Sequence, residues 1–382
     1  MYDNRFFHDH QAKTPILEGT RPTALKPPVY PLIAALTFLL FGFRNFFALF
    51  FLHAFLSALT CLLMFLSLKK YSYNIAAIAG FSLALYPPFV YHSVTVTENT
   101  TLLLFLIALF LLCFIKIQEN NSLKYWTLTG ITGGILALTE VVAIPFILVS
   151  LFYITFFTNS PRLKRTKKAA ISVLIIISLM LPWLVRNYIT FHRFGIFKSG
   201  SGQSMLHGLY ETGTGILIPE ETLLRLELNG RGKNEVEEDN AINEILIPLL
   251  YKNLGYLIRV HIPRNFVYFW WETKTHKHDK SLKYLLGRKL PYLVLLIFAL
   301  PSMVWWSFRM ISKPTTTLRE NVRENLGIIL LVLFTIPYCI YAATLLRYHF
   351  PIQLVMFSFF AETLNYSHSK ISLFAKSLAR PI

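Results

Sequence analysis

Three charged residues lie beside long apolar segments, where charge is rare: Glu98, Arg186 and Arg347. A carboxylate close to a bilayer is costly, so Glu98 is a functional candidate by default, although it could also be a cap or first-turn acid of the helix that follows. The two arginines could bind phosphate through the guanidinium fork or could anchor to lipid headgroups. We favour phosphate binding for Arg347 and an anchoring role for Arg186, which stays a second phosphate candidate. One carboxylate with arginines at a membrane surface suits proton removal from a hydroxyl beside a phosphate.

The composition of the chain predicts an all-α integral membrane protein. Of its 382 residues, 54% are hydrophobic and only 15% are charged, whereas soluble domains are about one-quarter charged. Apolar runs of roughly 20 residues can cross a bilayer only as helices, which satisfy their own backbone groups. We interpret the net charge of +17 as loop charge on the cytoplasmic side and expect no nucleic-acid partner, because the basic residues are not gathered on one soluble domain.

The apolar runs predict the order of the helices. Spans are expected at residues 46–68, 74–92, 101–117, 169–185, 290–308, 326–345 and 350–364. The second of these is broken near Pro87 and Pro88. Residues 125–157 are too long for one upright helix, and we predict two short helices that meet at Glu140. The run at 29–43 is marginal for crossing and is typical of a re-entrant or interfacial helix.

Residues 181–188, Leu-Pro-Trp-Leu-Val-Arg-Asn-Tyr, are predicted to end the helix over 169–185. Proline and tryptophan both suit a helix end at the lipid–water boundary. The residues that follow, 186–288, are then a large loop. The glycines at its start favour a turn-rich connector over a lid.

The basic links set the orientation and divide the chain. Residues 159–168 carry five basic residues and no acid, so this link is predicted to be cytoplasmic. The expected regions are the first extracytoplasmic loop at 1–27, an N-terminal transmembrane region at 28–185, a large extracytoplasmic loop at 186–288, a C-terminal transmembrane region at 289–366 and a cytoplasmic tail at 367–382. An outer position for 1–27 requires an upstream helix that this sequence lacks. Either 29–43 spans and the N-terminus is cytoplasmic, or the chain starts late.

Four stretches together resemble a known superfamily. They are Lys26-Pro27-Pro28-Val29-Tyr30-Pro31-Leu32, Val96-Thr97-Glu98, Leu181 to Tyr188 with Gly195 and Gly200, and Arg347-Tyr348-His349-Phe350-Pro351. In order and spacing they resemble the GT-C membrane glycosyltransferases of the protein-mannosyltransferase and aminoarabinose-transferase type. The likeness runs from about residue 3 across the chain. In the large loop, the segment from Asn234 to Trp271 resembles the amphipathic helices that this superfamily places before its next span.

This resemblance implies a polyprenyl-phosphate sugar donor, a glycan, lipid or protein acceptor, and inverting transfer of a hexosyl or pentosyl group outside a bacterial inner or plasma membrane. Asp3 takes the place of the catalytic base, with Asp9 as its rival, and Glu98 that of a supporting acid. Arg347, Arg186, Arg21 and Lys26 are the candidates for binding the donor phosphate. No cofactor is expected.

Other interpretations remain open at this stage. A divalent metal is a minor alternative, because His8-Asp9-His10 and His276-Lys277-His278-Asp279 offer ligands at poor spacing. A transporter or flippase would be expected to show internal repeats and broken helices at mid-bilayer, whereas no repeat is visible and the acids gather at one face. A non-catalytic relative, truncated before its first helix, is the third alternative.

Overall fold

The computed structural model describes residues 22–157, 162–195, 197–202, 204–206, 235–271, 282–312, 321–341 and 346–378. The side chains of Arg347 and of residues 368–378 lie outside this description, as do those of residues 162, 283, 341 and 346. Within the described residues every regular element is a helix, and no strand is present. The prediction of an all-α polytopic protein is therefore confirmed.

Among the described residues, five helices are long and apolar enough to cross a membrane, and a bent pair makes a sixth if it counts as one span. The five segments are Phe46–Lys69, Thr100–Asn120, Leu163–Phe191, Leu285–Ser312 and Val322–Ile340. The bent pair is α4 (Tyr73–Ala84) with α5 (Pro87–Thr95), which turn by 47° at the predicted proline break. The predicted span at 350–364 lies within α19 (Leu346–Leu378), which is not one of these segments.

The short apolar helix α2 (Val29–Phe41) folds back against α3 (Phe46–Lys69). The Tyr30 hydroxyl lies 3.3 Å from Nε2 of His53, and the backbone N–H of Val29 donates to the Leu138 carbonyl at 3.3 Å. At the turn between the two helices, large apolar side chains such as Phe43 and Phe47 are exposed. A helix of 13 residues is about 20 Å long, too short to cross the hydrocarbon upright.

The run at 125–157 forms two helices, as predicted. They are α7 (Leu123–Ala137) and α8 (Ala143–Phe156), and Glu140 lies in the turn between them. α6 (Thr100–Asn120) packs beside α7, and α7 packs along α9 (Arg162–Phe191). Gly130 permits the close approach of α7 to α9, because a Cβ on it would lie 2.9 Å from the Ser172 carbonyl oxygen.

The helix α9 corrects two of the predicted boundaries. It begins within the basic link at Arg162 and continues through Pro182 to Phe191, so residues 181–188 do not end it. Proline removes only one backbone donor, and apolar surroundings favour keeping the remaining helical bonds. The Arg165 side chain is buried and donates to the Ile154 carbonyl at 2.8 Å, which satisfies one of the last carbonyls of α8.

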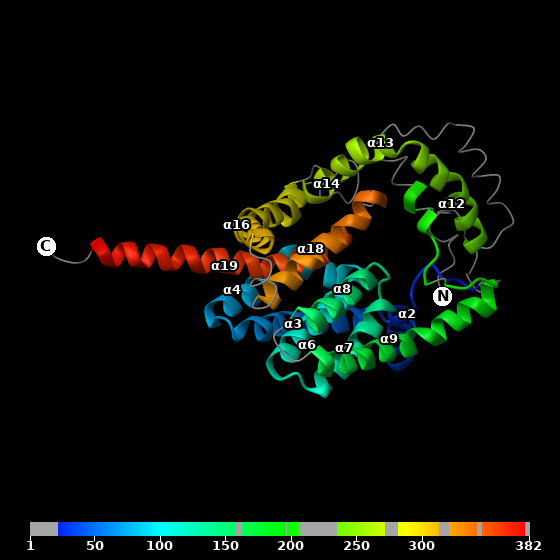
Figure 1. The fold of residues 1–382 in the computed structure, drawn as a ribbon, viewed down its shortest axis with the longest axis horizontal. Coiled ribbons are helices and arrows are strands. Elements are labelled where there is room, and N and C mark those ends of the chain that lie inside the picture. The colour runs from blue at the N-terminus through cyan, green and yellow to red at the C-terminus, as the bar shows by residue number, and fades with distance from the viewer. Residues whose placement is uncertain are drawn as a thin grey trace.

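The described helices between residues 235 and 312 run along one side of the bundle (Figure 1). α12 (Glu235–Lys252), α13 (Leu254–Tyr256), η1 (Leu257–His261) and α14 (Ile262–Trp271) follow one another. They match the amphipathic helices expected there. α15 (Leu282–Tyr284) and η2 (Leu285–Lys289) lead into α16 (Leu290–Ser312), which packs along α19, while α14 lies against α18 (Val322–Tyr341).

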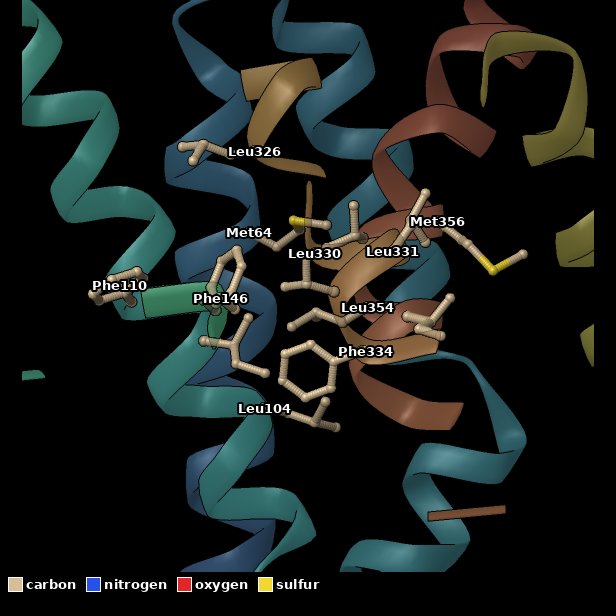
Figure 2. Close-up of a cluster of buried hydrophobic side chains, with 14 of the residues drawn as sticks. Met64, Leu104, Phe110, Phe146, Leu326, Leu330, Leu331, Phe334, Leu354 and Met356 are labelled. Atoms are coloured by element: carbon tan, nitrogen blue, oxygen red, sulfur yellow. The ribbon is translucent and has the colours of Figure 1, made fainter. Parts of the chain in front are cut away.

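The core of the bundle is built from aliphatic and aromatic side chains of helices far apart in sequence. Figure 2 shows Phe110 and Phe146 on one side and Phe334, Leu330 and Leu354 on the other. The Phe110 and Phe146 ring centroids are 5.6 Å apart, and those of Phe146 and Phe334 are 6.2 Å apart. This contact joins the N-terminal helices to α18 and α19.

Polar contacts gather at two ends of the bundle. At the end predicted to be cytoplasmic, Lys70 lies 3.6 Å from Glu119, Lys168 donates to the Asn121 carbonyl, and Arg323 lies over the ring of Tyr71. The other end holds the polar contacts of Glu140. Loops that the charge rule assigns to one side of the membrane thus lie together at one end of the bundle.

Candidate functional site

Glu140 is the central acid of the end of the bundle that is predicted to be extracytoplasmic. Its side chain is buried, with the residue 8% exposed, in the turn between α7 and α8. The Asn99 amide donates to Oε2 of Glu140 at 3.1 Å and to the Thr139 carbonyl at 2.9 Å. Lys198, from the segment after α9, donates to Oε1 at 3.3 Å. Glu140 therefore joins the start of α6 to the large loop.

The electrostatic setting keeps Glu140 ionised. Burial by itself would raise the pKa of this carboxyl, since the charged form loses its water. Lys198 opposes this effect most strongly, with help from the Asn99 amide and the charge of Lys26, and the net result is a pKa below its ordinary value. Glu140 is thus a poor proton acceptor, and its contacts fit a structural acid.

Glu98 lies at the same end, half-buried in the turn before α6. The interpretation of Glu98 as a cap or first-turn acid of α6 is wrong, because Asn99 occupies the N-cap position and the first turn holds no acid. Asn99 gives no side-chain cap to α6, since its amide is directed to Glu140 and Thr139. Glu98 is therefore next to a residue that is fixed by the buried acid.

Lys26 is exposed and lies just before α2, close enough for its charge to lower the pKa of Glu140. The Pro-Pro-Val-Tyr-Pro run after it begins α2, where Pro28 is the N-cap residue. The backbone bond from Val29 to Leu138 holds this helix start beside the turn that carries Glu140. This phosphate candidate and the buried acid therefore belong to one polar cluster.

Arg186 lies inside α9, not beyond its end. Its Nη1 donates to the Thr23 carbonyl at 3.1 Å and to Oδ1 of Asn187 at 2.7 Å. Its guanidinium carbon lies 5.1 Å from the Trp183 ring centroid and 5.6 Å from that of Phe191. These contacts connect the N-terminal segment to α9, as expected of a residue with an anchoring role.

Two carboxylates of α12 hold the segment after α9 in place. Glu235 accepts from the Thr23 hydroxyl at 2.7 Å, from the Ser199 hydroxyl at 2.9 Å and from the backbone N–H of Ala24. Asp239 accepts from the hydroxyl and the backbone N–H of Ser201 at 3.0 and 3.1 Å. Four parts of the chain thus meet here: the N-terminal segment, α9, the loop after α9 and α12.

The backbone of this segment requires two glycines. Gly200 has a φ of +91°, which residues with a Cβ rarely adopt. A Cβ on Gly202 would lie 2.7 Å from the Asp239 carbonyl oxygen, and its N–H donates to Oδ1 of Asp239 at 2.6 Å. The start of the large loop is therefore a packed connector in its described residues.

The first turn of α19 lies at the same end of the bundle. Phe350 lines a small cavity with His92, Thr100 and Thr101, and its ring centroid is 5.0 Å from that of His92. Arg347 belongs to this turn, and its side chain is outside the described part of the chain. The backbone that carries Arg347 is therefore next to the start of α6, which follows Glu98.

Several candidates fall outside the described residues. These are Asp3, Asp9, Arg21 and the histidine-containing runs at 8–10 and 276–279. Among the residues that the structure describes, no three His, Cys, Asp or Glu side chains are grouped so as to hold a metal ion.

Sequence reasoning did not single out Lys198, Asn99 or Asp239 as site residues. Asn99 could have been noticed because it follows Glu98 directly. Lys198 is one basic residue in a mixed loop, and its pairing with an acid 58 residues earlier has no local signal. The sequence places Asp239 only within a segment of expected helices, and no local pattern indicates that its carboxylate accepts hydrogen bonds from Ser201 and Gly202.

The fold and the site together define a polytopic helical membrane protein with a cluster of acids and cations at one end of its bundle. Residues 25–185 match the family model described as dolichyl-phosphate-mannose-protein mannosyltransferase. This match supports the assignment to the GT-C superfamily of membrane glycosyltransferases that the motifs indicated. No curated protein and no solved structure matches the chain.

Proposed function

We propose that this glycosyltransferase moves one sugar from a polyprenyl-phosphate carrier to a glycan, lipid or protein acceptor on the extracytoplasmic face. The observation that supports the proposal most is that three features lie at one end of the bundle. They are Lys26, the turn that carries Glu98, and the first turn of α19, which carries Arg347. These come from three of the four motif stretches, and the family match includes the first two of them.

The reaction is a single displacement. The acceptor hydroxyl oxygen attacks the anomeric carbon, the bond from that carbon to the phosphate oxygen breaks, and the electron pair leaves with the phosphate. The hydroxyl proton passes to Asp3, the proposed base, and Glu98 supports the acceptor. Fixed cations stabilise the departing phosphate, for which Lys26, Arg21 and Arg347 are the candidates. Arg186, with its contacts to Thr23 and Asn187, acts mainly as an anchor.

A direct test compares the lipid-linked sugars of cells that carry the intact chain with those of cells that carry Asp3→Asn or Glu98→Gln. The expected result is accumulation of one polyprenyl-phosphate sugar, measured by mass spectrometry, together with loss of one sugar from an envelope glycan or protein. Glu244→Gln, an exposed acid of α12, is the matched control. Unchanged lipid-linked sugars in both variants at normal protein levels would rule out this donor.

The proposed face is tested separately by cysteine labelling. Asp3→Cys is placed in a background without Cys61, Cys113 and Cys339 and treated with a membrane-impermeant thiol reagent. Labelling of intact cells supports a base on the outer face. Protection until the membrane is permeabilised would exclude Asp3 as a base for chemistry outside.

A further inference from the structure

One buried face of η1 and α14 is formed by three residues spaced four apart in the chain: His261, Asn265 and Phe269. All three side chains are buried. Residues at this spacing lie one above the other on a single face of a helix. Because η1 and α14 belong to the segment between α9 and α16, this face shows where that segment is attached to the helix bundle.

The first two residues of this face contact the last turn of α18. The Asn265 amide donates to the Cys339 carbonyl at 2.9 Å, and Nε2 of His261 lies 3.1 Å from the Ile340 carbonyl oxygen. The last carbonyls of a helix have no donor within the helix, so a neighbouring side chain must supply one. The end of α18 is therefore held by η1 and α14.

The third residue of the face, Phe269, packs on His349 in the first turn of α19. The ring centroids of these two residues are 4.5 Å apart. The rings of Trp270 and Tyr292 are nearly perpendicular to the His349 ring, with centroids 5.7 and 5.0 Å away. The Tyr292 hydroxyl donates to the Trp270 carbonyl at 2.7 Å, which joins α16 to α14 at this point. The buried imidazole is thus packed among three aromatic rings from two helices.

The residues on either side of this histidine are packed by other helices. Tyr348 stacks on Tyr338 of α18, with centroids 4.6 Å apart and 23° between the rings. Phe350 contacts His92 of α5, with centroids 5.0 Å apart. Three consecutive residues of α19 are therefore held by four other helices. Arg347 directly precedes them in the same helical turn, so these contacts set the place of its backbone.

We infer that His349 is a positioning residue, through which the buried face of η1 and α14 fixes the backbone of Arg347 for binding the donor phosphate. This inference rests on the proposed function, in which Arg347 is a candidate for that contact. A guanidinium binds phosphate best through two parallel N–H···O bonds, so a small displacement of its backbone lowers the affinity. The segment between α9 and α16 thereby gains a role in the site.

The test uses the full chain in nanodiscs and measures the binding of farnesyl phosphate and of farnesol. The ratio of the two affinities reports on recognition of the phosphate, because a loss of folded protein lowers both. Arg347→Gln is expected to lower this ratio about tenfold, the effect of losing one charge-assisted contact. His349→Ala, which removes the packed ring, should lower it about fivefold or more. His349→Phe keeps a ring in the aromatic site and should keep the ratio within about twofold.

A double variant distinguishes positioning from general packing. If His349 acts through Arg347, adding His349→Ala to Arg347→Gln should lower the ratio no further. Losses that multiply would show that His349 acts independently of Arg347 and would overturn the inference. Phe110→Ala removes a buried ring from the core of the bundle and is the control. It should lower the thermal stability and leave the ratio unchanged, and an equal fall in the ratio would also contradict the role of His349.

Phe269→Leu tests the same contact from the side of α14. It keeps an apolar side chain in the core but removes the ring that packs on His349, and the ratio should fall about threefold or more. This variant decides the question if His349→Ala does not fold. An unchanged ratio in folded protein would show that α14 does not act on the phosphate contact.

The outcomes separate this inference from the proposed function. A phosphate preference that is intact in His349→Ala and Phe269→Leu would overturn the role of His349 and leave the proposed function standing. Equal binding of farnesyl phosphate and farnesol by the unaltered chain would instead overturn the phosphate carrier as donor. A clear preference in the unaltered chain that Arg347→Gln does not change would remove Arg347 from the phosphate site, and the role of His349 with it.

Discussion

The Lys198 ammonium and the Glu140 carboxylate lie 3.3 Å apart although 58 residues separate them in the chain. The acid is in a turn between two apolar helices, and the lysine is in the segment that follows α9. This ion pair connects the membrane bundle to the large loop, so its energetics bear on both stability and function.

Breaking this pair from either side should destabilise the protein. Lys198→Met removes the ammonium partner of a buried carboxylate that keeps its bond from Asn99, and we expect a loss of about 2 kcal/mol in unfolding free energy, since the ammonium is partly exposed. Unfolding in detergent, followed by near-ultraviolet circular dichroism, measures this loss. Lys69→Met provides the matched control. An unchanged midpoint for Lys198→Met would show that the pair is not formed.

The same pair predicts a dependence on pH. The folded-state pKa of Glu140 lies below the ordinary value of 4.5, so the unfolded chain binds the proton more readily. The stability from this shift is complete above the ordinary value and is lost as the pH falls below 4.5 towards the folded-state pKa. The difference in melting temperature between the unaltered chain and Glu140→Gln should therefore shrink on acidification below that value. A difference that grows there would contradict the assignment.

Glu235 should stabilise the junction between α12 and the N-terminal segment. It accepts bonds from Thr23, Ala24 and Ser199, so Glu235→Ala leaves three donors without this acceptor. We expect a loss of about 2–3 kcal/mol. Limited proteolysis should then cut the large loop faster. Glu244→Gln, on the exposed side of the same helix, should behave like the unaltered chain.

Gly202→Ala should be the most disruptive of the glycine substitutions near the site. Its Cβ would meet the backbone oxygen of Asp239 at 2.7 Å, which cannot move aside as a flexible side-chain end can. Gly200→Ala should also be unfavourable, because its φ of +91° strains a residue with a Cβ. Gly255→Ala serves as the control, since a Cβ there meets nothing within 4 Å. Comparable thermal stability for all three variants would contradict this prediction.

Asn265 should be needed for the end of α18. It donates to the Cys339 carbonyl at 2.9 Å, and His261 Nε2 lies 3.1 Å from the Ile340 carbonyl oxygen. These carbonyls belong to the last turn of a helix and have no helical donor. Asn265→Ala should cost about 1–3 kcal/mol, measured by thermal unfolding. Arg259→Ala, an exposed residue of the preceding turn, should cost little.

Arg186→Lys should separate the anchoring role from phosphate binding. Lysine cannot both stack on Trp183 and reach Thr23 as the guanidinium does, so stability without any donor should fall by about 1–2 kcal/mol. Thermal unfolding of the unliganded protein in detergent checks this. Unaltered stability combined with weaker farnesyl phosphate binding would instead make Arg186 a phosphate ligand.

The sequence by itself determined the class of protein and the order of its helices. Hydropathy is a local property, so apolar runs located the helices, the prolines at 87 and 88 located a bend, and the glycine-rich and acidic break at 125–157 located the turn at Glu140. The motif stretches likewise pointed to the superfamily that the family match supports.

Tertiary structure alone decided which charged groups meet. The sequence predicts that a helix ends at Pro182, yet α9 continues past this residue. Two contacts hold its last turns in place: the Trp183 indole N–H donates to the Phe197 carbonyl, and the Arg186 guanidinium donates to the Thr23 carbonyl. The partners of Glu140 and Glu235 come from distant segments, and no periodicity encodes them. Hydropathy can locate a helix because burial in lipid depends on the segment itself, whereas an ion pair depends on packing that brings two segments together.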